Sequence, residues 1–173
     1  MKKSDAPMNI LETARLVLRR FTLEDAAFIL ELVNEKGFLQ NIGDKGVRTI
    51  EDARDYIRTG PQASYLKHGF GLYRVELTMT GEPVGMCGIL QRDTLEHPDI
   101  GFALLERFWG NGYAYESASA VLQFGRKELG LDRIGAITSP GNHTSIRLLE
   151  KIGLEYETLV VLTEGEPAVK LFS

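Results

Sequence analysis

Hydrophobic and polar residues alternate near the N-terminus in a way that predicts a strand followed by a helix. Residues 14–21, ARLVLRRF, place apolar side chains between charged ones with the two-residue period of a strand. Thr22 follows, and Asp25 stands three positions later, a variant of the capping box that begins a helix. The run LEDAAFILELVN then repeats apolar residues at helical spacing. The helix is expected to bury Ala26, Phe28, Ile29, Leu32 and Val33.

A second helix and a hairpin are predicted in the next part of the chain. TIEDARDYIRTG begins at Thr49 with another capping box and should end near Gly60 and Pro61, because proline interrupts helical hydrogen bonding. The preceding GFLQNIGDKGV is interrupted by glycines and is interpreted as a loop. GFGLYRVELT and PVGMCGILQR flank the turn MTGE, which predicts a β-hairpin.

The C-terminal half alternates strands and helices. DIGFALL (99–105) and RIGAITSP (133–140) are predicted strands, and a helix from about Ala114 to Leu129 lies between them. NHTSIRLLEKIG is a helix with Asn142 as its N-cap and Gly153 after its last turn. YETLVVLT and AVKLFS, joined by EGEP, form a closing hairpin. With no repeat or linker, residues 1–173 are interpreted as a single α/β domain.

Composition and charge narrow the function classes. The chain has 173 residues, of which 43% are hydrophobic and 25% charged, as in an ordinary globular domain. Its formal net charge is −4 and it has no cluster of Lys and Arg, so a nucleic-acid-binding surface is not expected. No apolar run reaches the roughly 20 residues that span a bilayer, so no membrane association is expected.

The N-terminus and the single cysteine indicate a cytoplasmic protein. MKKSDAPMNI begins with charge but lacks the apolar core of a signal peptide. Cys87 has no second cysteine in the chain with which to pair, which favours a reducing compartment. It lies in the apolar run PVGMCGIL, so a buried structural thiol is favoured over a nucleophile.

Two glycines in WGNGYAY (109–115) stand between a predicted strand and a predicted helix. Gly110 and Gly112 allow positive φ and a close approach of backbone to a ligand. The first turn of a helix has N–H groups without intrahelical partners, so one interpretation is an anion site. A tight structural connection is the alternative. The dinucleotide pattern GxGxxG is not matched, because Tyr115 stands where its third glycine belongs, and no P-loop Gly-Lys-Ser/Thr follows.

The segment from DIGFALL to GLEYE, residues 99–157, resembles the acetyl-CoA-binding part of the GNAT N-acetyltransferase superfamily. WGNGYA lies on the pyrophosphate loop of that family, Q/R-x-x-G-x-G/A, and WGxGYA is typical of its RimJ/RimL-type branch, related to ribosomal-protein-alanine N-acetyltransferases. ETARLVLRRFTLEDA is similar to the opening strand and helix of the family, so the resemblance covers about residues 12–160. It implies an α/β (α+β) fold with a mixed, mostly antiparallel sheet of about seven strands, flanked by about four helices, and with splayed central strands.

The resemblance also implies the residues that hold acetyl-CoA. Backbone N–H groups of the glycine loop would bind the CoA pyrophosphate, and the open edge of strand 99–105 would bind the pantetheine arm. Asn142 would approach that arm, although a role as N-cap explains it equally well. Many relatives carry Lys or Arg where Asn111 stands, so more of the phosphate binding falls to the backbone. The implied cofactor-binding residues are Phe102, Ala103, Leu104, Trp109, Gly110, Asn111, Gly112, Tyr113, Ala114 and Asn142.

The catalytic residues are less clearly marked. Many GNAT enzymes protonate the departing CoA thiolate with a tyrosine, and Leu149 occupies the matching position here. Ser145 is the substitute candidate, or it simply satisfies N–H groups in the first helical turn. The attacking amine must lose a proton to a base or a water chain. Asp99 is the first candidate, with Glu76 and Glu96 as alternatives. No His, Cys or carboxylate set has metal-ligand spacing, so no metal is expected.

The resemblance implies an acetyl-CoA-dependent N-acetyltransferase that transfers the acetyl group directly to a primary amine. The acceptor is a protein N-terminus or a small amine. A wide cleft beside residues 37–47 would favour a peptide, and an enclosed acidic pocket would favour a polyamine or amino sugar. A GNAT-like domain that binds acyl-CoA as a sensor or assembly module is the alternative. Hairpin edges of this fold are compatible with a homodimer.

Overall fold

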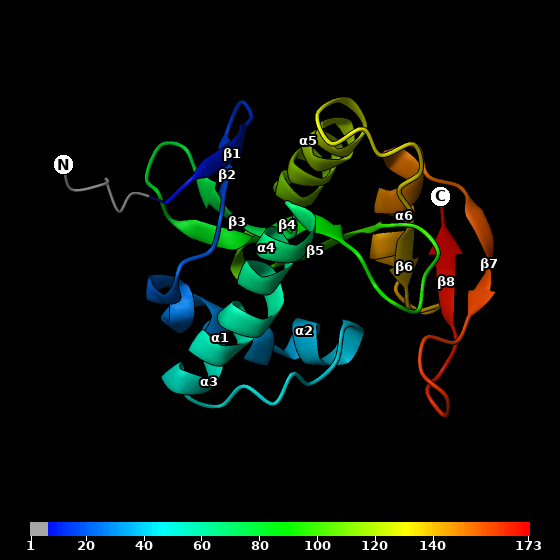
Figure 1. The fold of residues 1–173 in the computed structure, drawn as a ribbon, viewed down its shortest axis with the longest axis horizontal. Coiled ribbons are helices and arrows are strands. Elements are labelled where there is room, and N and C mark those ends of the chain that lie inside the picture. Colours follow the sequence, from blue (N-terminus) through cyan, green and yellow to red (C-terminus); the bar gives the residue numbers. More distant parts are fainter. Residues whose placement is uncertain (1–6) are drawn as a thin grey trace.

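Five strands form one antiparallel sheet in the computed structural model, which describes residues 7–173 (Figure 1). The order in the sheet follows the chain: β1 (Asn9–Glu12), β2 (Leu16–Arg19), β3 (Leu72–Leu77), β4 (Pro83–Leu90) and β5 (Asp99–Leu104). Strand β1 was not predicted. The four-residue β1 pairs with β2, with Leu11 opposite Leu18, and Ala14 and Arg15 form the bend between them instead of beginning a strand. Residues 1–6, part of the predicted non-signal N-terminus, lie outside the described residues.

A second sheet of three strands continues the fold at the other end of the molecule. It has the order β6 (Ala136–Thr138), β8 (Val169–Phe172), β7 (Tyr156–Val160), and all its pairs are antiparallel. The closing hairpin of β7 and β8 is therefore confirmed. The two sheets meet at a single parallel bridge between Asp99 and Gly135. Beyond that bridge β5 and β6 separate, as the splayed central strands of the prediction require.

Alternation along the strands builds two cores on opposite faces of the five-stranded sheet. Tyr73 and Cys87 point to the face covered by helix α5 (Tyr113–Lys127), whereas Leu72 and Met86 point to the face covered by α1 (Ala26–Asn34) and α3 (Ile50–Ile57). Figure 1 shows α5 on the opposite side of the sheet from α1 and α3. The expected apolar stripe of α1 is fully buried. The predicted mixed, mostly antiparallel α/β fold is confirmed.

The helices differ from the prediction where local signals compete with packing. Six α-helices are present among residues 7–173, and α2 (Lys36–Asn41) lies in a segment predicted to be a loop. The helix that begins at Thr49 does not end at Pro61. A π-helical turn (Arg58–Gln62) carries the chain past Pro61 into α4 (Ala63–His68), because the wider turn accommodates the proline and buries its ring. The last helix, α6 (His143–Lys151), follows Asn142 as predicted.

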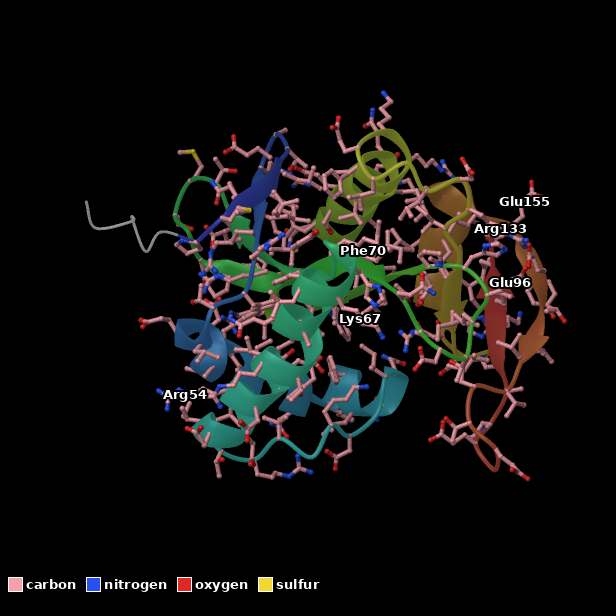
Figure 2. All side chains as sticks on the ribbon, viewed as in Figure 1. Arg54, Lys67, Phe70, Glu96, Arg133 and Glu155 are labelled. Atoms are coloured by element: carbon pink, nitrogen blue, oxygen red, sulfur yellow. The ribbon has the colours of Figure 1, made fainter. Side chains whose placement is uncertain are left out.

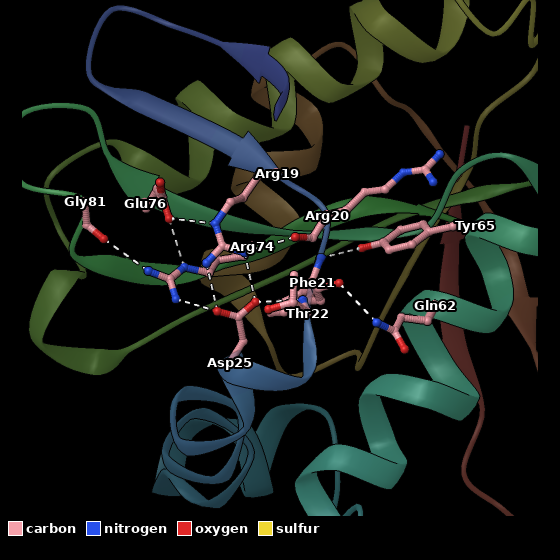
Figure 3. A network of polar contacts seen from close by, with 10 residues as sticks. All are labelled: Arg19, Arg20, Phe21, Thr22, Asp25, Gln62, Tyr65, Arg74, Glu76 and Gly81. Carbon is pink, nitrogen blue, oxygen red and sulfur yellow. Dashed lines mark hydrogen bonds and ion pairs between the residues drawn. The ribbon is translucent and has the colours of Figure 1, made fainter. Parts of the chain in front are cut away.

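A buried ionic network joins the start of α1 to the sheet (Figure 3). Asp25 accepts hydrogen bonds from Arg19 Nη2 at 2.8 Å and Arg74 Nη1 at 2.7 Å, and from the N–H of Thr22 at 2.9 Å. Glu76 pairs with the Nε atoms of both arginines, at 3.1 and 3.0 Å. Burial alone would raise the pKa of Asp25, but the hydrogen bonds and charges of these partners hold it below its usual value. The capping box predicted at Thr22 is thus part of a tertiary contact.

Candidate functional site

The glycine loop, WGNGYAY (109–115), lies in the connection from β5 to α5 and includes the start of that helix. Gly110 has φ +78° and Gly112 has φ +81°, a left-handed conformation that side chains disfavour, so both positions require glycine. Gly112 is the N-cap of α5, and the helix begins at Tyr113, one residue before the predicted start. The sequence pattern of a strand, a glycine loop and a helix is therefore present in three dimensions.

Five consecutive amides of this loop are free to bind a ligand. The backbone N–H groups of residues 110–114 have no hydrogen-bond acceptor within the part of the chain that the structure describes. They precede a helix of 15 residues, whose N-terminal partial charge favours an anion. A Cβ built on Gly110 would meet no atom within 4 Å, so the approach to that residue is open. Such an arrangement, called the cradle below, is suited to binding an anion.

Side chains of the loop support its shape from outside. Trp109 Nε1 donates a hydrogen bond to the carbonyl oxygen of Leu104 at 3.0 Å. Its ring packs on Gly37 of α2, where a Cβ would lie 2.5 Å from the indole Cη2. Asn111 turns back on the loop, and its Nδ2 donates to the carbonyl oxygen of Phe108 at 3.0 Å. Trp109 and Asn111 thus hold the backbone that carries the free amides.

The wedge is the region beyond the bridge of Asp99 and Gly135, where β5 and β6 are no longer paired. The bridge determines which backbone groups of β5 face this wedge. The N–H of Ile100 donates to the carbonyl oxygen of Gly135 at 2.8 Å. Because strand residues alternate, the backbone polar groups of Phe102 and Leu104 point to the same side, and those of Ala103 point towards β4. No hydrogen bond joins Phe102 to β6 within residues 7–173. Of the three predicted contacts in β5, Phe102 and Leu104 present backbone to the wedge and Ala103 does not.

Asp99 lies at the closed end of the wedge. Its side chain is fully buried, and both its carboxylate oxygens accept hydrogen bonds from Arg92 Nε, at 3.0 and 3.1 Å. Burial raises the pKa of Asp99 to about 6, against the opposing charge and hydrogen bond of Arg92. Such a carboxyl group can exchange a proton near neutral pH, but only through water or a movement that opens the site.

The alternative carboxylates lie elsewhere. Glu76 belongs to the network around Asp25, and Glu96 lies in the loop after β4 (Figure 2). The Glu96 side chain is 88% exposed. Among residues 7–173, neither side chain forms a hydrogen bond or an ion pair with a residue of β5 or β6. Asp99 is the only one of the three candidates located at the junction of those two strands.

Helix α6 brings Asn142 and Ser145 together. Asn142 Oδ1 accepts a hydrogen bond from the N–H of Ser145 at 3.2 Å, which confirms the N-cap. The Nδ2 group of Asn142 and the hydroxyl of Ser145 have no hydrogen-bond partner among residues 7–173, and both residues are half-buried. Leu149 is 1% exposed and packs in the core. The two polar side chains are therefore available to a ligand, and Leu149 is a structural residue.

Comparison with known proteins identifies the family. The model of the "Acetyltransferase (GNAT) domain" matches residues 15–155, most of the chain. The sequence is also 34% identical to the "Uncharacterized N-acetyltransferase YoaA" of Bacillus subtilis over 151 residues, which cover 86% of this chain and 84% of that protein. This chain belongs to the GNAT acetyltransferase family. It is an acetyltransferase, and enzymes of this family use acetyl-CoA as the acetyl donor.

Solved GNAT structures share the fold. An acetyltransferase of the GNAT family from Bacillus anthracis superposes with a TM-score of 0.77 at 26% identity, covering 95% of this chain and 96% of that one. RimL, described as a ribosomal L7/L12 alpha-N-protein acetyltransferase in complex with coenzyme A, superposes with a TM-score of 0.80 at 17% identity, covering 95% and 96%. At that identity the likeness to RimL is one of fold.

Two cavities flank the GNAT core. One of about 320 Å³ lies between the α3–α4 segment and the end of β4, where Leu90 is the register partner of Asp99. Its lining contains no carboxylate; the residues are Tyr56, Thr59, Gly60, Pro61, Ala63, Ser64, Lys67, His68, Leu72, Leu90 and Gln91. The other, of about 300 Å³, lies between α5 and α6 and includes Arg126, Lys127 and Lys151.

Among residues 7–173, no helix combines the length and the apolar character needed to cross a bilayer. Within residues 7–173 no three His, Cys, Asp or Glu side chains are grouped so that they could hold a metal ion.

The sequence did not indicate several residues that shape the site. Arg92 neutralises Asp99, Gly37 makes room for Trp109, and Arg15 and Glu116 join the first hairpin to α5. Each acts on a partner on another element. No pattern of neighbouring residues in the chain could have revealed these contacts.

Proposed function

We propose that this GNAT protein transfers the acetyl group of acetyl-CoA directly to a primary amine in a ternary complex. The observation that carries the proposal is the row of five free amides at the start of α5, beside strands that separate. In this proposal residues 1–173 act as one domain in the cytoplasm. Cys87 is fully buried, and burial raises the pKa of its thiol to about 12, which argues against an acetyl-cysteine intermediate.

The free amides of residues 110–114 bind the CoA pyrophosphate in this proposal. The pantetheine arm lies along the open edge of β5, where Phe102 and Leu104 offer backbone groups, and Asn142 donates from its Nδ2. One of the β5 N–H groups also stabilises the oxyanion that forms when the amine adds to the thioester carbonyl. Trp109, Asn111 and Ala103 contribute by supporting the loop and strand.

Two protons move in the proposed reaction. The amine nitrogen forms a bond to the carbonyl carbon and loses a proton through water to Asp99. The C–S bond then breaks, and the Ser145 hydroxyl protonates the departing thiolate. Ser145 regains a proton from water, and Asp99 releases its proton to water, so that both side chains return to their starting states. Ser145→Ala should therefore lower turnover more than it lowers acetyl-CoA affinity, and equal turnover in mutant and parent would remove Ser145 from this role.

The cavity lined by Leu90, the register partner of Asp99, indicates which class of amine acceptor is favoured. An enclosed acidic pocket would have favoured a polyamine or amino sugar, but the lining has no carboxylate and contains Lys67 and His68. A polycation would meet no opposite charge there. We therefore favour a peptide N-terminus, in line with the RimJ/RimL-type branch, over a polycationic small amine.

A module that binds acyl-CoA without turnover is the second candidate. Leu149 favours it, because its fully buried aliphatic side chain cannot protonate a thiolate. Measuring CoA release with a panel of peptides and amines separates the two. Release with a peptide acceptor supports the transferase, whereas tight acetyl-CoA binding without release on any acceptor supports the module. If acetyl-CoA does not bind, both proposals fail.

The loop assignment has its own test in Gly112→Val. A side chain at φ +81°, with Arg15 Nη2 only 3.3 Å from the new Cβ, should distort the amide row and weaken CoA binding by at least tenfold, since such strain costs about 1–3 kcal/mol. Gly130→Val is the matched control, because Gly130 has φ +65° with no atom near its Cβ. Isothermal titration calorimetry should find CoA affinity lost only in the first variant. Equal affinity in both would refute the assignment.

A further inference from the structure

A side chain from the N-terminal hairpin reaches the glycine loop. Arg15 lies in the bend between β1 and β2, and its Nη1 donates a hydrogen bond to the carbonyl oxygen of Asn111, 96 positions away, at 2.9 Å. Its Cζ lies 4.5 Å from the centre of the Tyr113 ring. The guanidinium therefore contacts the loop backbone and covers the first residue of α5.

Glu116 fixes the position of this arginine. Its Oε2 accepts from Arg15 Nε at 2.7 Å, and its Oε1 accepts from the N–H of Arg15 at 2.9 Å and from Thr13 Oγ1 at 2.7 Å. Partial burial would raise the pKa of Glu116, but these hydrogen bonds hold it below its usual value, so the carboxylate is ionised at neutral pH. The bend is bound to α5 through backbone and side chains together.

The hydrogen bond to Asn111 controls the direction of an amide in the loop. In a trans peptide the carbonyl of one residue and the N–H of the next point in opposite directions, and the described residues contain no cis peptide. Since the Asn111 carbonyl points to Arg15, the N–H of Gly112 points away from it. That N–H is one of the five free amides of the cradle.

The loop has no cation of its own. Asn111 is neutral, and its side chain is turned back to the carbonyl oxygens of Phe108 and Trp109. Arg15 has five N–H donors, of which its Nε and one on each Nη atom are used by Glu116 and Asn111. With 47% of its side chain exposed, the guanidinium keeps two donors and its charge beside the loop.

We propose that Arg15 is a positioning residue for acetyl-CoA. It sets the peptide between Asn111 and Gly112 so that the Gly112 N–H points into the pyrophosphate site, and Glu116 holds it in place. The N-terminal hairpin is thereby part of the cofactor site. This inference rests on the proposed assignment of the loop to CoA pyrophosphate.

The test compares CoA with pantetheine, which lacks the pyrophosphate, on three variants of the full chain. Arg15→Met keeps the approximate length of the side chain and removes its hydrogen-bond donors. Arg15→Lys keeps the positive charge but lacks the planar, forked set of guanidinium donors. Arg54→Met is the matched control, because Arg54 is 45% exposed and paired with Glu51 on α3, far from α5 (Figure 2). Affinities are measured by calorimetry for CoA and by competition for pantetheine, and circular dichroism checks that each variant is folded.

Arg15→Met should raise the Kd of CoA by about 10- to 30-fold, since a charge-assisted hydrogen bond contributes on this scale. Arg15→Lys should raise it by roughly threefold, and it carries the test if Arg15→Met does not fold. Arg54→Met should leave it unchanged, and no variant should change pantetheine binding.

Three results would overturn the inference. Equal CoA affinity in Arg15→Met and Arg54→Met would show that the loop does not need Arg15. Equal losses for CoA and pantetheine would show a general effect on the fold. A full rescue by lysine would show that charge alone matters and that the peptide orientation does not. Absence of CoA binding in the parent would instead refute the proposed function itself.

Discussion

Asp25 and Asp99 are both buried aspartates that pair with arginine, yet their surroundings give them opposite chemistry. Asp25 receives two guanidinium groups and a backbone N–H, and its pKa is held below the usual value. Asp99 receives only Arg92, itself 36% exposed, and burial raises its pKa to about 6. The balance between the depth of burial and the number of donors thus decides whether a buried carboxylate remains a permanent anion or becomes a group that exchanges protons near neutral pH.

The same difference separates a structural site from a candidate catalytic one. Asp25 joins α1 to β2 and β3, and both of its carboxylate oxygens accept hydrogen bonds from arginines inside the fold. Asp99 lies where β5 and β6 begin to separate, and its register partner Leu90 lines the cavity of about 320 Å³. Changing each aspartate to the neutral asparagine should therefore have different consequences.

The largest expected effect is on stability. Asp25→Asn leaves Arg19 and Arg74 without their shared anion in a buried place, and breaking such a network costs about 3–5 kcal/mol. Chemical denaturation at pH 7 measures the free energy of unfolding. Asp55→Asn is the control, because Asp55 pairs with Arg58 at 2.7 Å on the surface and should change that free energy by less than about 1 kcal/mol. Similar losses of unfolding free energy in the two variants would show that the network around Asp25 stabilises the fold no more than a surface ion pair does.

The pH dependence of stability should come next. Because the folded-state pKa of Asp99 lies above its unfolded value, the folded protein binds its proton more tightly, and stability from this group is present at low pH and lost as pH rises towards 6. Relative to Asp99→Asn, the parent should lose about 3 kcal/mol in all as the pH rises from about 2 to about 8, with about two thirds of that loss between pH 4 and pH 6. Asp25 acts in the opposite sense, since its stabilisation is lost as pH falls below its usual pKa. Parallel stability curves for parent and Asp99→Asn would contradict the raised pKa.

The smallest of the three effects concerns turnover. If Asp99 accepts the amine proton, Asp99→Asn should lower kcat about a hundredfold, or about 2.7 kcal/mol, and remove an apparent pKa near 6 from the rate profile. CoA affinity should stay within twofold, which separates this variant from those of the loop. Unchanged kcat would leave Asp99 with the role of closing the wedge, and another base would have to be sought.

Local signals predicted much of the fold. The capping boxes at Thr22 and Thr49, the N-cap Asn142 and the positive-φ glycines of the loop were recognisable because each depends on residues within a few positions of one another. The hairpin of β3 and β4 was likewise recognisable, from two strand-like runs on either side of a short turn. These features gave the elements around the candidate cofactor loop, and the resemblance of the motifs in residues 99–157 indicated the family.

Local signals also misled where packing decided the outcome. Pro61 predicts a helix end, but its ring is buried and the chain continues through a π turn into α4. The residues of β1 are too few to mark a strand, and they form one because β2 offers them a partner in the hairpin. Helix α2 forms in a glycine-containing segment, where Gly37 makes room for Trp109.

The sequence by itself determined the order of most elements and the position of the glycine loop, because these follow from short-range periodicity and from the conformational freedom of glycine. The resemblance of its motifs between DIGFALL and GLEYE indicated the family. Only the tertiary structure decided which charges meet. In the folded protein two arginines pair with Asp25 and one pairs with Asp99. The fold also places Arg15 within hydrogen-bond distance of Asn111. Electrostatic interactions and desolvation depend on distances in space, and distances between remote residues exist only once the chain has folded.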